Sequence, residues 1–399
     1  MQPIRPRFLN LLTTTLTCAA VLMTAGCDSE PLEDDSEELL DEDLDENPPF
    51  EPADELTPAD EFAPPPSEPA VPYYQLTEDN GMLIAEGQDY RVRIHRSRQV
   101  VELNVSDEML SDWYSRPFSR WAPGATRRLY QVFADDFDFI VFSAATVGQH
   151  HGLPHDGESV RVSNDIQGLG LSQFDRTDWY GSQGRLQSAV MLGGIDHVVS
   201  GPSLRELGER WGNALVLTSH VDHFGFSDVG GQLGGCSLGT IESVGEDLWY
   251  CDFNGTTKWS PDGADRNDRP YAELELYLMG LVPAEAVPPI TWAEDGEWVD
   301  PNKGLFTGTV ETADINDLRA VHGKRYPAHD QSPREFRTLF VVLSSGELID
   351  YPRFHHFDAR VREFAAPYNI ADQQKMYNFY EATSGLARLD TKKLDASLL

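Results

Sequence analysis

The hydrophobic and polar positions of this chain follow two different periods along its length. Strands are expected where apolar residues alternate with polar ones or form short continuous runs. These segments are 90–94, 99–105, 138–143, 185–192 and 336–343. Helices are expected where apolar residues recur three or four positions apart. These segments are 126–133, 203–217, 272–281 and 351–383. The order of these elements predicts an α/β (α+β) fold.

The first 26 residues have the pattern of an export signal. A short basic start precedes an apolar run from Phe8 to Met23, and small residues precede Cys27. The ending Thr24-Ala-Gly-Cys27 resembles the lipobox of bacterial lipoproteins. That resemblance implies cleavage before Cys27, lipidation of Cys27 and anchoring in the bacterial cell envelope. We favour the outer membrane or the cell surface over the inner membrane. An ordinary secretory leader with a chance cysteine is the alternative.

Residues 27–72 combine the lipidated Cys27 with an acidic, proline-rich tract. Residues 28–72 contain 18 Asp and Glu and no Lys or Arg. Because like charges repel and proline stiffens the chain, we expect an extended, disordered tether. The partner expected at this end of the chain is a membrane, reached through Cys27.

The rest of the chain is acidic as well. The net charge is −35, and residues 1–26 contribute +2 while residues 28–72 contribute −18. Residues 73–399 therefore carry −19 and are expected to form one globular domain. Since phosphate binding needs a basic face, we expect no nucleic acid partner.

Two of the four cysteines lie in the globular part of the sequence. Cys236 and Cys251 form an even pair in an exported chain, which favours a disulfide. Two buried free thiols remain the alternative.

The helix expected at 203–217 has a local explanation for most of its residues. Ser203 and Glu206 fit a capping box. Arg205 with Glu209, and Glu206 with Arg210, are opposite charges at i,i+4 spacing. Gly212 is the one residue that such local rules leave unexplained, since glycine weakens a helix.

Over most of residues 85–390 the chain resembles a group of exported bacterial zincin-like metalloproteases, the H-E-x-x-H type. The resemblance depends on six segments. They are 134–142, 164–170, 201–211, 222–231, 274–283 and 379–383. In such relatives the third segment contains H-E-L-G-H-x-W, whose two histidines bind zinc while the glutamate acts as general base.

In this chain Glu206 keeps the general-base position, as a vestige, while Arg205 and Glu209 stand at the two histidine positions. A guanidinium cannot lose its proton to bind a metal. The resemblance therefore implies a zincin-like fold with a twisted mixed sheet and a central cleft helix, and with Glu206 facing a cleft that holds no metal. It also implies an upper lobe at 73–218 and a lower lobe at 219–399.

The third ligand of such a site has two readings. In the extended motif its position is Leu215, and no ligand survives; if the next segment supplies it, His223 or His220 is the candidate. Residues 278–281 fit either the methionine-bearing turn of some zincins or a helix end capped by Gly280, and we favour the helix end.

Three functions remain open from the sequence. We favour an inactive pseudoprotease that binds a peptide or protein, or that serves as a surface structural protein, without a cofactor. The first alternative is an active zinc-dependent endopeptidase with a non-standard site, for which zinc would be the cofactor. The second alternative is an unrelated α/β extracellular binding protein.

Overall fold

A computed structural model describes residues 74–79, 81–153, 156–212, 215, 223–252, 265–370 and 376–399. These residues belong to the second of two compact units, which spans Asp60–Leu399. The expected leader, the expected lipidation site Cys27, the expected acidic tether and His220 lie outside the described residues. Among the helices that are described, none is long and apolar enough to cross a membrane.

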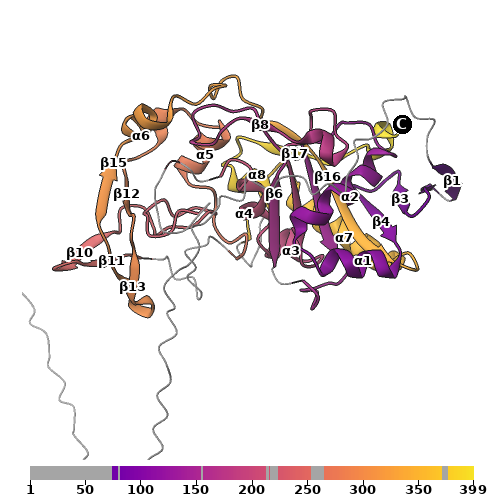
Figure 1. Cartoon of the computed structure of the whole chain (residues 1–399), viewed down its shortest axis with the longest axis horizontal. Coiled ribbons are helices and arrows are strands. Elements are labelled where there is room, and N and C mark those ends of the chain that lie inside the picture. The colour runs from indigo at the N-terminus through magenta and orange to yellow at the C-terminus, as the bar shows by residue number, and fades with distance from the viewer. Residues whose placement is uncertain are drawn as a thin grey trace, which may run out of the picture. The chain divides into compact units, whose positions relative to one another are not determined.

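A large mixed sheet organises the described residues (Figure 1). Its main path runs β1 (Gln75–Asp79), β2 (Met82–Glu86), β3 (Arg91–His95), β4 (Val100–Val105), β16 (Glu335–Ser345), β5 (Phe139–Ala144), β9 (Ser188–Leu192) and β6 (Gly157–Arg161). Strands β4, β16, β5 and β9 are parallel, whereas β1 to β4 pair antiparallel and β6 is antiparallel to β9. β17 (Arg388–Asp390) adds to one end of β16 in parallel.

The central strands are buried on both faces, as their apolar sequences require. In β5, Phe139 and Val141 belong to one hydrophobic cluster and Ile140 and Phe142 to the other, because successive side chains of a strand point to opposite faces. The mixed α/β class expected from the sequence is therefore observed.

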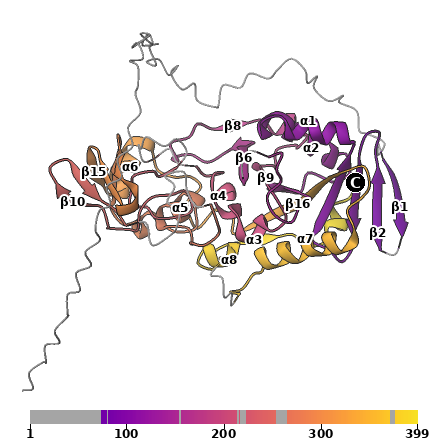
Figure 2. The ribbon, with the colours of Figure 1, turned by 90° about the horizontal axis from the view of Figure 1, so that it is seen from below.

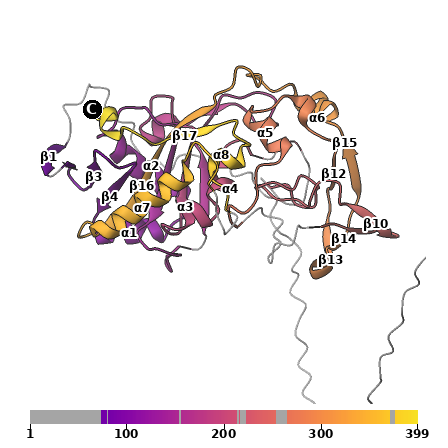
Figure 3. The ribbon, with the colours of Figure 1, turned by 180° about the vertical axis from the view of Figure 1, so that it is seen from behind.

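Helices cover both faces of this sheet. α1 (Asp107–Tyr114) and α2 (Phe118–Tyr130) lie on one face, and α7 (Tyr351–Phe364) with α3 (His197–Ser200) lies on the other (Figure 2). In the view from behind, α7 lies across the strands of the sheet (Figure 3). Most buried residues of α2 belong to the cluster of Ile140, and most buried residues of α7 belong to the cluster of Phe139.

β16 belongs to the expected lower lobe at 219–399, whereas its neighbours β4 and β5 belong to the expected upper lobe at 73–218. The two expected lobes therefore share one sheet.

The remaining elements are short. They are β7 (Ser163–Asn164), β8 (Phe174–Asp175), α4 (Ser203–Gly208), β10 (Glu242–Gly245), β11 (Leu248–Tyr250), α5 (Glu273–Met279), β12 (Ile290–Ala293), β13 (Glu297–Asp300), β14 (Leu305–Thr307), β15 (Val310–Ala313), α6 (Ile315–His322) and α8 (Phe379–Ala382). The described residues also form four short 3-10 turns, at Thr177–Tyr180, Ala284–Ala286, Pro301–Lys303 and Leu394–Ser397. β10, β11, β14 and β13 form a second, antiparallel sheet, and β12 pairs with β15. The sequence pattern predicted none of these short strands.

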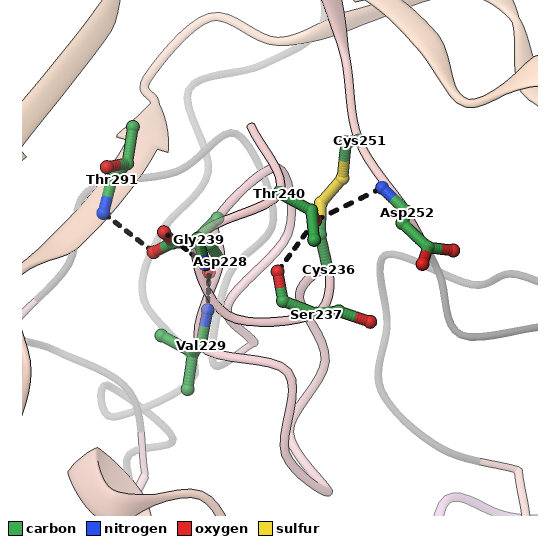
Figure 4. The surroundings of a disulfide bond; sticks show 10 residues. Asp228, Val229, Cys236, Ser237, Gly239, Thr240, Cys251, Asp252 and Thr291 are labelled. Atoms are coloured by element: carbon green, nitrogen blue, oxygen red, sulfur yellow. Dashed lines mark hydrogen bonds between the residues drawn. A yellow bond between two sulfur atoms is a disulfide. The ribbon is translucent and has the colours of Figure 1, made fainter. Parts of the chain in front are cut away.

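The expected cysteine pair joins the loop before β10 to the residue that follows β11. Cys236 and Cys251 form a disulfide with 5.9 Å between their Cα atoms (Figure 4). Beside it, the Ser237 N–H donates to the Asp252 carbonyl at 2.7 Å, and the Thr240 hydroxyl donates to the Ser237 carbonyl at 2.6 Å. The Asp228 carboxylate accepts from the Thr291 N–H at 2.7 Å, which ties this loop to β12.

One expected helix is interrupted. The segment 351–383 forms α7 and α8, and the described residues between them, 365–370 and 376–378, are not helical. Phe364 in α7 and Phe379 in α8 are both buried. The helical spacing of apolar residues over 351–383 therefore arises from two separate helices that each pack into the core. The single-helix prediction is therefore wrong.

The end of α5 confirms the helix-end interpretation of residues 278–281. Gly280 has φ +77°, its N–H donates to the Tyr277 carbonyl at 2.9 Å, and the Leu281 N–H donates to the Leu276 carbonyl at 2.8 Å. This is the Schellman pattern that ends helices at a left-handed glycine.

Gly280→Ala should destabilise the protein by about 2 kcal/mol or more, because alanine disfavours this φ. Its Cβ would also lie 2.3 Å from the Ser332 hydroxyl and 2.5 Å from the Arg325 guanidinium carbon. Urea unfolding of the purified chain measures the effect. The matched control is Gly148→Ala, where a Cβ meets nothing within 4 Å. Equal stability of the two variants would contradict the prediction.

Candidate functional site

The helix α4 is fixed at its N-terminus by a side chain from a distant loop. The Asn267 amide oxygen accepts from the Leu204 N–H at 2.9 Å, and its nitrogen donates to the Val199 carbonyl at 2.9 Å. The Ser203 hydroxyl donates instead to the His197 carbonyl at 2.8 Å, and Pro202 is the N-cap. The predicted capping box of Ser203 and Glu206 is therefore wrong, because Asn267 satisfies the helix N-terminus.

The helix is also shorter than the predicted 203–217. It ends at Gly208, and a turn follows to Trp211. Gly212 has φ +52°, and a Cβ there would lie 2.4 Å from an Arg161 guanidinium nitrogen. The left-handed backbone and this close approach explain why position 212 is glycine.

Arg210 does not pair with Glu206, contrary to the predicted i,i+4 pair. Its guanidinium is completely buried and donates to Gln187 at 3.2 Å, Asn164 at 3.3 Å and Asp165 at 3.4 Å. Burial lowers the pKa of Arg210 to about 10. The turn after α4 is thereby linked to the segment 164–170, another part of the zincin-like pattern.

Arg205, Glu206 and Glu209 come together in one cluster. An Arg205 guanidinium nitrogen lies 2.6 Å from the Glu206 carboxylate, and another lies 3.9 Å from Glu209. Asp265 lies 3.7 Å from the same guanidinium. Glu206 is 1% exposed, so the expectation that it faces a cleft is wrong: its carboxylate is enclosed and paired inside the protein.

His223 joins the same cluster through Glu209. Its Nε2 lies 3.4 Å from one Glu209 oxygen, and the Ser159 hydroxyl donates to the other at 2.5 Å. The structure thus brings together four residues singled out in the sequence, namely Arg205, Glu206, Glu209 and His223. It leaves Leu215 as a buried apolar residue, and the alternative candidate His220 lies outside the described residues.

The two glutamates have opposite pKa shifts. Burial, followed by the nearby negative charge of Glu209, raises the pKa of Glu206 to about 8. Burial also acts to raise the pKa of Glu209, but interactions with His223, Ser159 and Arg205 outweigh it and lower that pKa overall. Glu209 is therefore the carboxylate that holds the negative charge at neutral pH.

The edge strand β6 borders this cluster and was missed in the sequence. Ser159 comes from β6, and a Cβ on its Gly157 would lie 2.7 Å from a Glu206 oxygen. The alternation of Val160 and Val162 with polar residues was a signal for this strand, but it is only a few residues long.

A second buried carboxylate connects α5 to the loop after His223. Glu275 accepts from the N–H groups of Gln232 at 3.1 Å, Leu233 at 2.6 Å and Ala272 at 2.7 Å. Burial raises the pKa of Glu275 to about 7, although these hydrogen bonds oppose the shift. The Tyr271 hydroxyl donates to the Leu204 carbonyl at 2.5 Å, so the same region also holds α4.

The carboxylates of Glu206 and Glu209 lie around the Arg205 guanidinium, which stands where a metal ion would need to bind. Glu206, Glu209 and His223 carry groups that can ligate a metal, but the Arg205 guanidinium has no lone pair to offer. Within the described part of the chain, no group of three or more His, Cys, Asp or Glu side chains is placed to hold a metal ion.

Comparisons with protein-family models, with curated proteins and with solved structures found no match to this chain.

Glu206→Gln should remove part of the pH dependence of stability. Because the folded-state pKa of Glu206 is raised to about 8, the folded protein keeps a proton that the unfolded chain loses near pH 4.5. This contribution is present below pH 4.5 and is lost as the pH rises to 8, on the order of a few kcal/mol. Thermal unfolding of both proteins from pH 4.5 to 8.5 measures the difference.

The exposed Glu297→Gln is the matched control and should keep the wild-type pH profile. A Glu206→Gln variant that is folded and has the wild-type pH profile would show that Glu206 titrates normally.

Proposed function

We propose that this chain is an exported, lipid-anchored protein with a zincin-like metallopeptidase fold that lacks peptidase activity and acts by binding a peptide or protein. The mixed sheet, the edge strand β6 and the helix α4 beside it support the fold assignment. The leader and the sequence before Cys27 support export and anchoring in the cell envelope.

The observation that carries the proposal is the position of the Arg205 guanidinium. Arg205 stands at the first histidine position of the zincin motif; its guanidinium contacts Glu206, at the general-base position, at 2.6 Å and lies 3.9 Å from Glu209, at the second histidine position. A fixed positive charge at this point repels a divalent cation and removes one of its ligands. A metal-activated water, which zinc peptidases use as the nucleophile, then has no support at this site.

The proposed binding of a peptide is based on the edge of β6 that pairs with no described strand. This strand ends the path of the large sheet and pairs only with β9 among the described strands. An extended peptide can add to such an edge through main-chain hydrogen bonds. Ser159 and Glu209 lie beside it and would contribute polar contacts to a bound segment.

The alternative of an active zinc endopeptidase is favoured by one observation, the contact between Glu209 and His223. A carboxylate and an imidazole 3.4 Å apart are two ligand types that zinc accepts. Such a site would require Arg205 to leave the cluster. The unrelated α/β binding protein has no observation of its own in its favour.

Replacing both residues at the former histidine positions should create a zinc site. In Arg205→His/Glu209→His the new imidazoles share one face of α4, because Glu209 keeps helical backbone angles. His223 is near enough to position 209 to act as the third ligand. We expect about one zinc per chain in the variant and less than about 0.1 in the wild type, measured by mass spectrometry of the metal content.

Two controls make the result specific. Arg205→Ala/Glu209→Ala removes the same charges without adding imidazoles and should stay free of zinc. Adding His223→Ala to the histidine variant should weaken zinc binding about tenfold or more. Stoichiometric zinc in the wild type would refute the inactive site, and a folded histidine variant without zinc would refute the zincin geometry.

A further inference from the structure

A positively charged cavity lies in this acidic protein, apart from the residues of the α4 cluster. It has a volume of about 610 Å³ and lies where β16, β17 and the C-terminal segment meet. Its lining includes five cationic side chains, namely Arg185, Arg337, Arg388, Lys392 and Lys393. Three carboxylates also line it, so the lining has an excess of two positive charges in a chain whose net charge is −35.

The arginines of the cavity already have carboxylate partners. Arg388 lies 2.6 Å from Glu335, and Arg337 lies 3.0 Å from Asp390. In contrast, neither Lys392 nor Lys393 takes part in an ion pair with any described residue. The excess positive charge therefore resides on these two lysines.

The turn that carries the two lysines is held in an unusual conformation. Lys393 has φ +55°, a backbone angle that residues other than glycine rarely adopt. The Arg337 guanidinium donates to the carbonyls of Lys392 and Lys393, and the Asp390 carboxylate accepts from the Lys392 N–H at 3.1 Å. These contacts fix the backbone of the two lysines where it borders the cavity.

We propose that this cavity binds a carboxylate-rich peptide segment. Two lysines that have no ion-pair partner among the described residues, beside arginines that already bind carboxylates, are suited to further carboxylates. The volume is in the range of pockets that enclose several residues of a ligand. The inference does not depend on the zincin-like function.

One such segment is present in the chain itself. Residues 28–47 contain 12 Asp and Glu and no basic residue. The hydroxyl of Tyr74, the first described residue, donates to the Leu399 carbonyl at 3.1 Å. Leu399 is close in sequence to Ser397, which lines the cavity. Another acidic polypeptide could supply the same chemistry, and the experiment below distinguishes the two sources.

The test uses a fluorescent synthetic peptide with the sequence of residues 28–47 and two forms of the mature full-length chain. One form is wild type, and in the other the 12 acidic residues of 28–47 are replaced by Asn and Gln. Fluorescence anisotropy at about 50 mM salt should detect binding to the neutralised chain, and higher salt should weaken it through screening.

Lys392→Glu/Lys393→Glu in the neutralised chain should weaken peptide binding about tenfold or more. Lys303→Glu/Lys324→Glu makes the same change in net charge outside the cavity and should leave binding within about twofold of the parent. Lys392→Gln/Lys393→Gln, a milder change, should give a smaller loss with an unaltered circular dichroism spectrum.

Binding to the neutralised chain alone would identify the protein's own acidic segment as the ligand. Equal binding to both forms would support an acidic segment of another polypeptide. The proposal is overturned if the peptide does not bind the neutralised chain, or if the control pair weakens binding as much as the cavity pair.

Discussion

A carboxylate that is removed from water needs a cation or hydrogen-bond donors inside the protein, and Glu206 meets this need through Arg205. Because the guanidinium is permanently charged, the pairing does not depend on a bound ion. Glu209 lies 3.9 Å from the same cation, and contacts with His223 and Ser159 stabilise it further. The chain around α4 thus places Arg205 against two acidic side chains, of which Glu209 holds the negative charge at neutral pH.

That compensation requires parts of the chain far apart in sequence to meet. Asn267 and Tyr271 hold α4 from the loop before α5, while β6 contributes Ser159 from the edge of the sheet. Glu275 then fixes the loop that follows His223. The sheet provides the rigid base, since its parallel strands are buried on both faces and Trp211 packs against Phe139 of β5.

The elements that the sequence predicted well are those with long apolar patterns. β5 and β16 were found because buried parallel strands are continuous apolar runs, and α5 was found with its glycine cap. The end of α4 was not found, because the backbone of Gly212 and the burial of Arg210 are set by tertiary contacts with distant residues. The meeting of His223 with Glu209 depends on loop geometry, which no local pattern of the sequence encodes.

Arg205 at α4 and Arg337 at the cavity both pair with carboxylates, but their surroundings differ. At α4 the guanidinium is matched by carboxylates on its own and neighbouring elements, so the charge is satisfied within the protein. At the C-terminal cavity Arg337 is matched as well, yet the same side chain fixes the backbone of Lys392 and Lys393 and leaves their ammonium groups without a described partner. A satisfied charge stabilises the fold, whereas an unsatisfied one at a cavity remains available to a ligand. The lysines are therefore the groups available to an anion, whereas the Arg205 guanidinium is already paired within the protein.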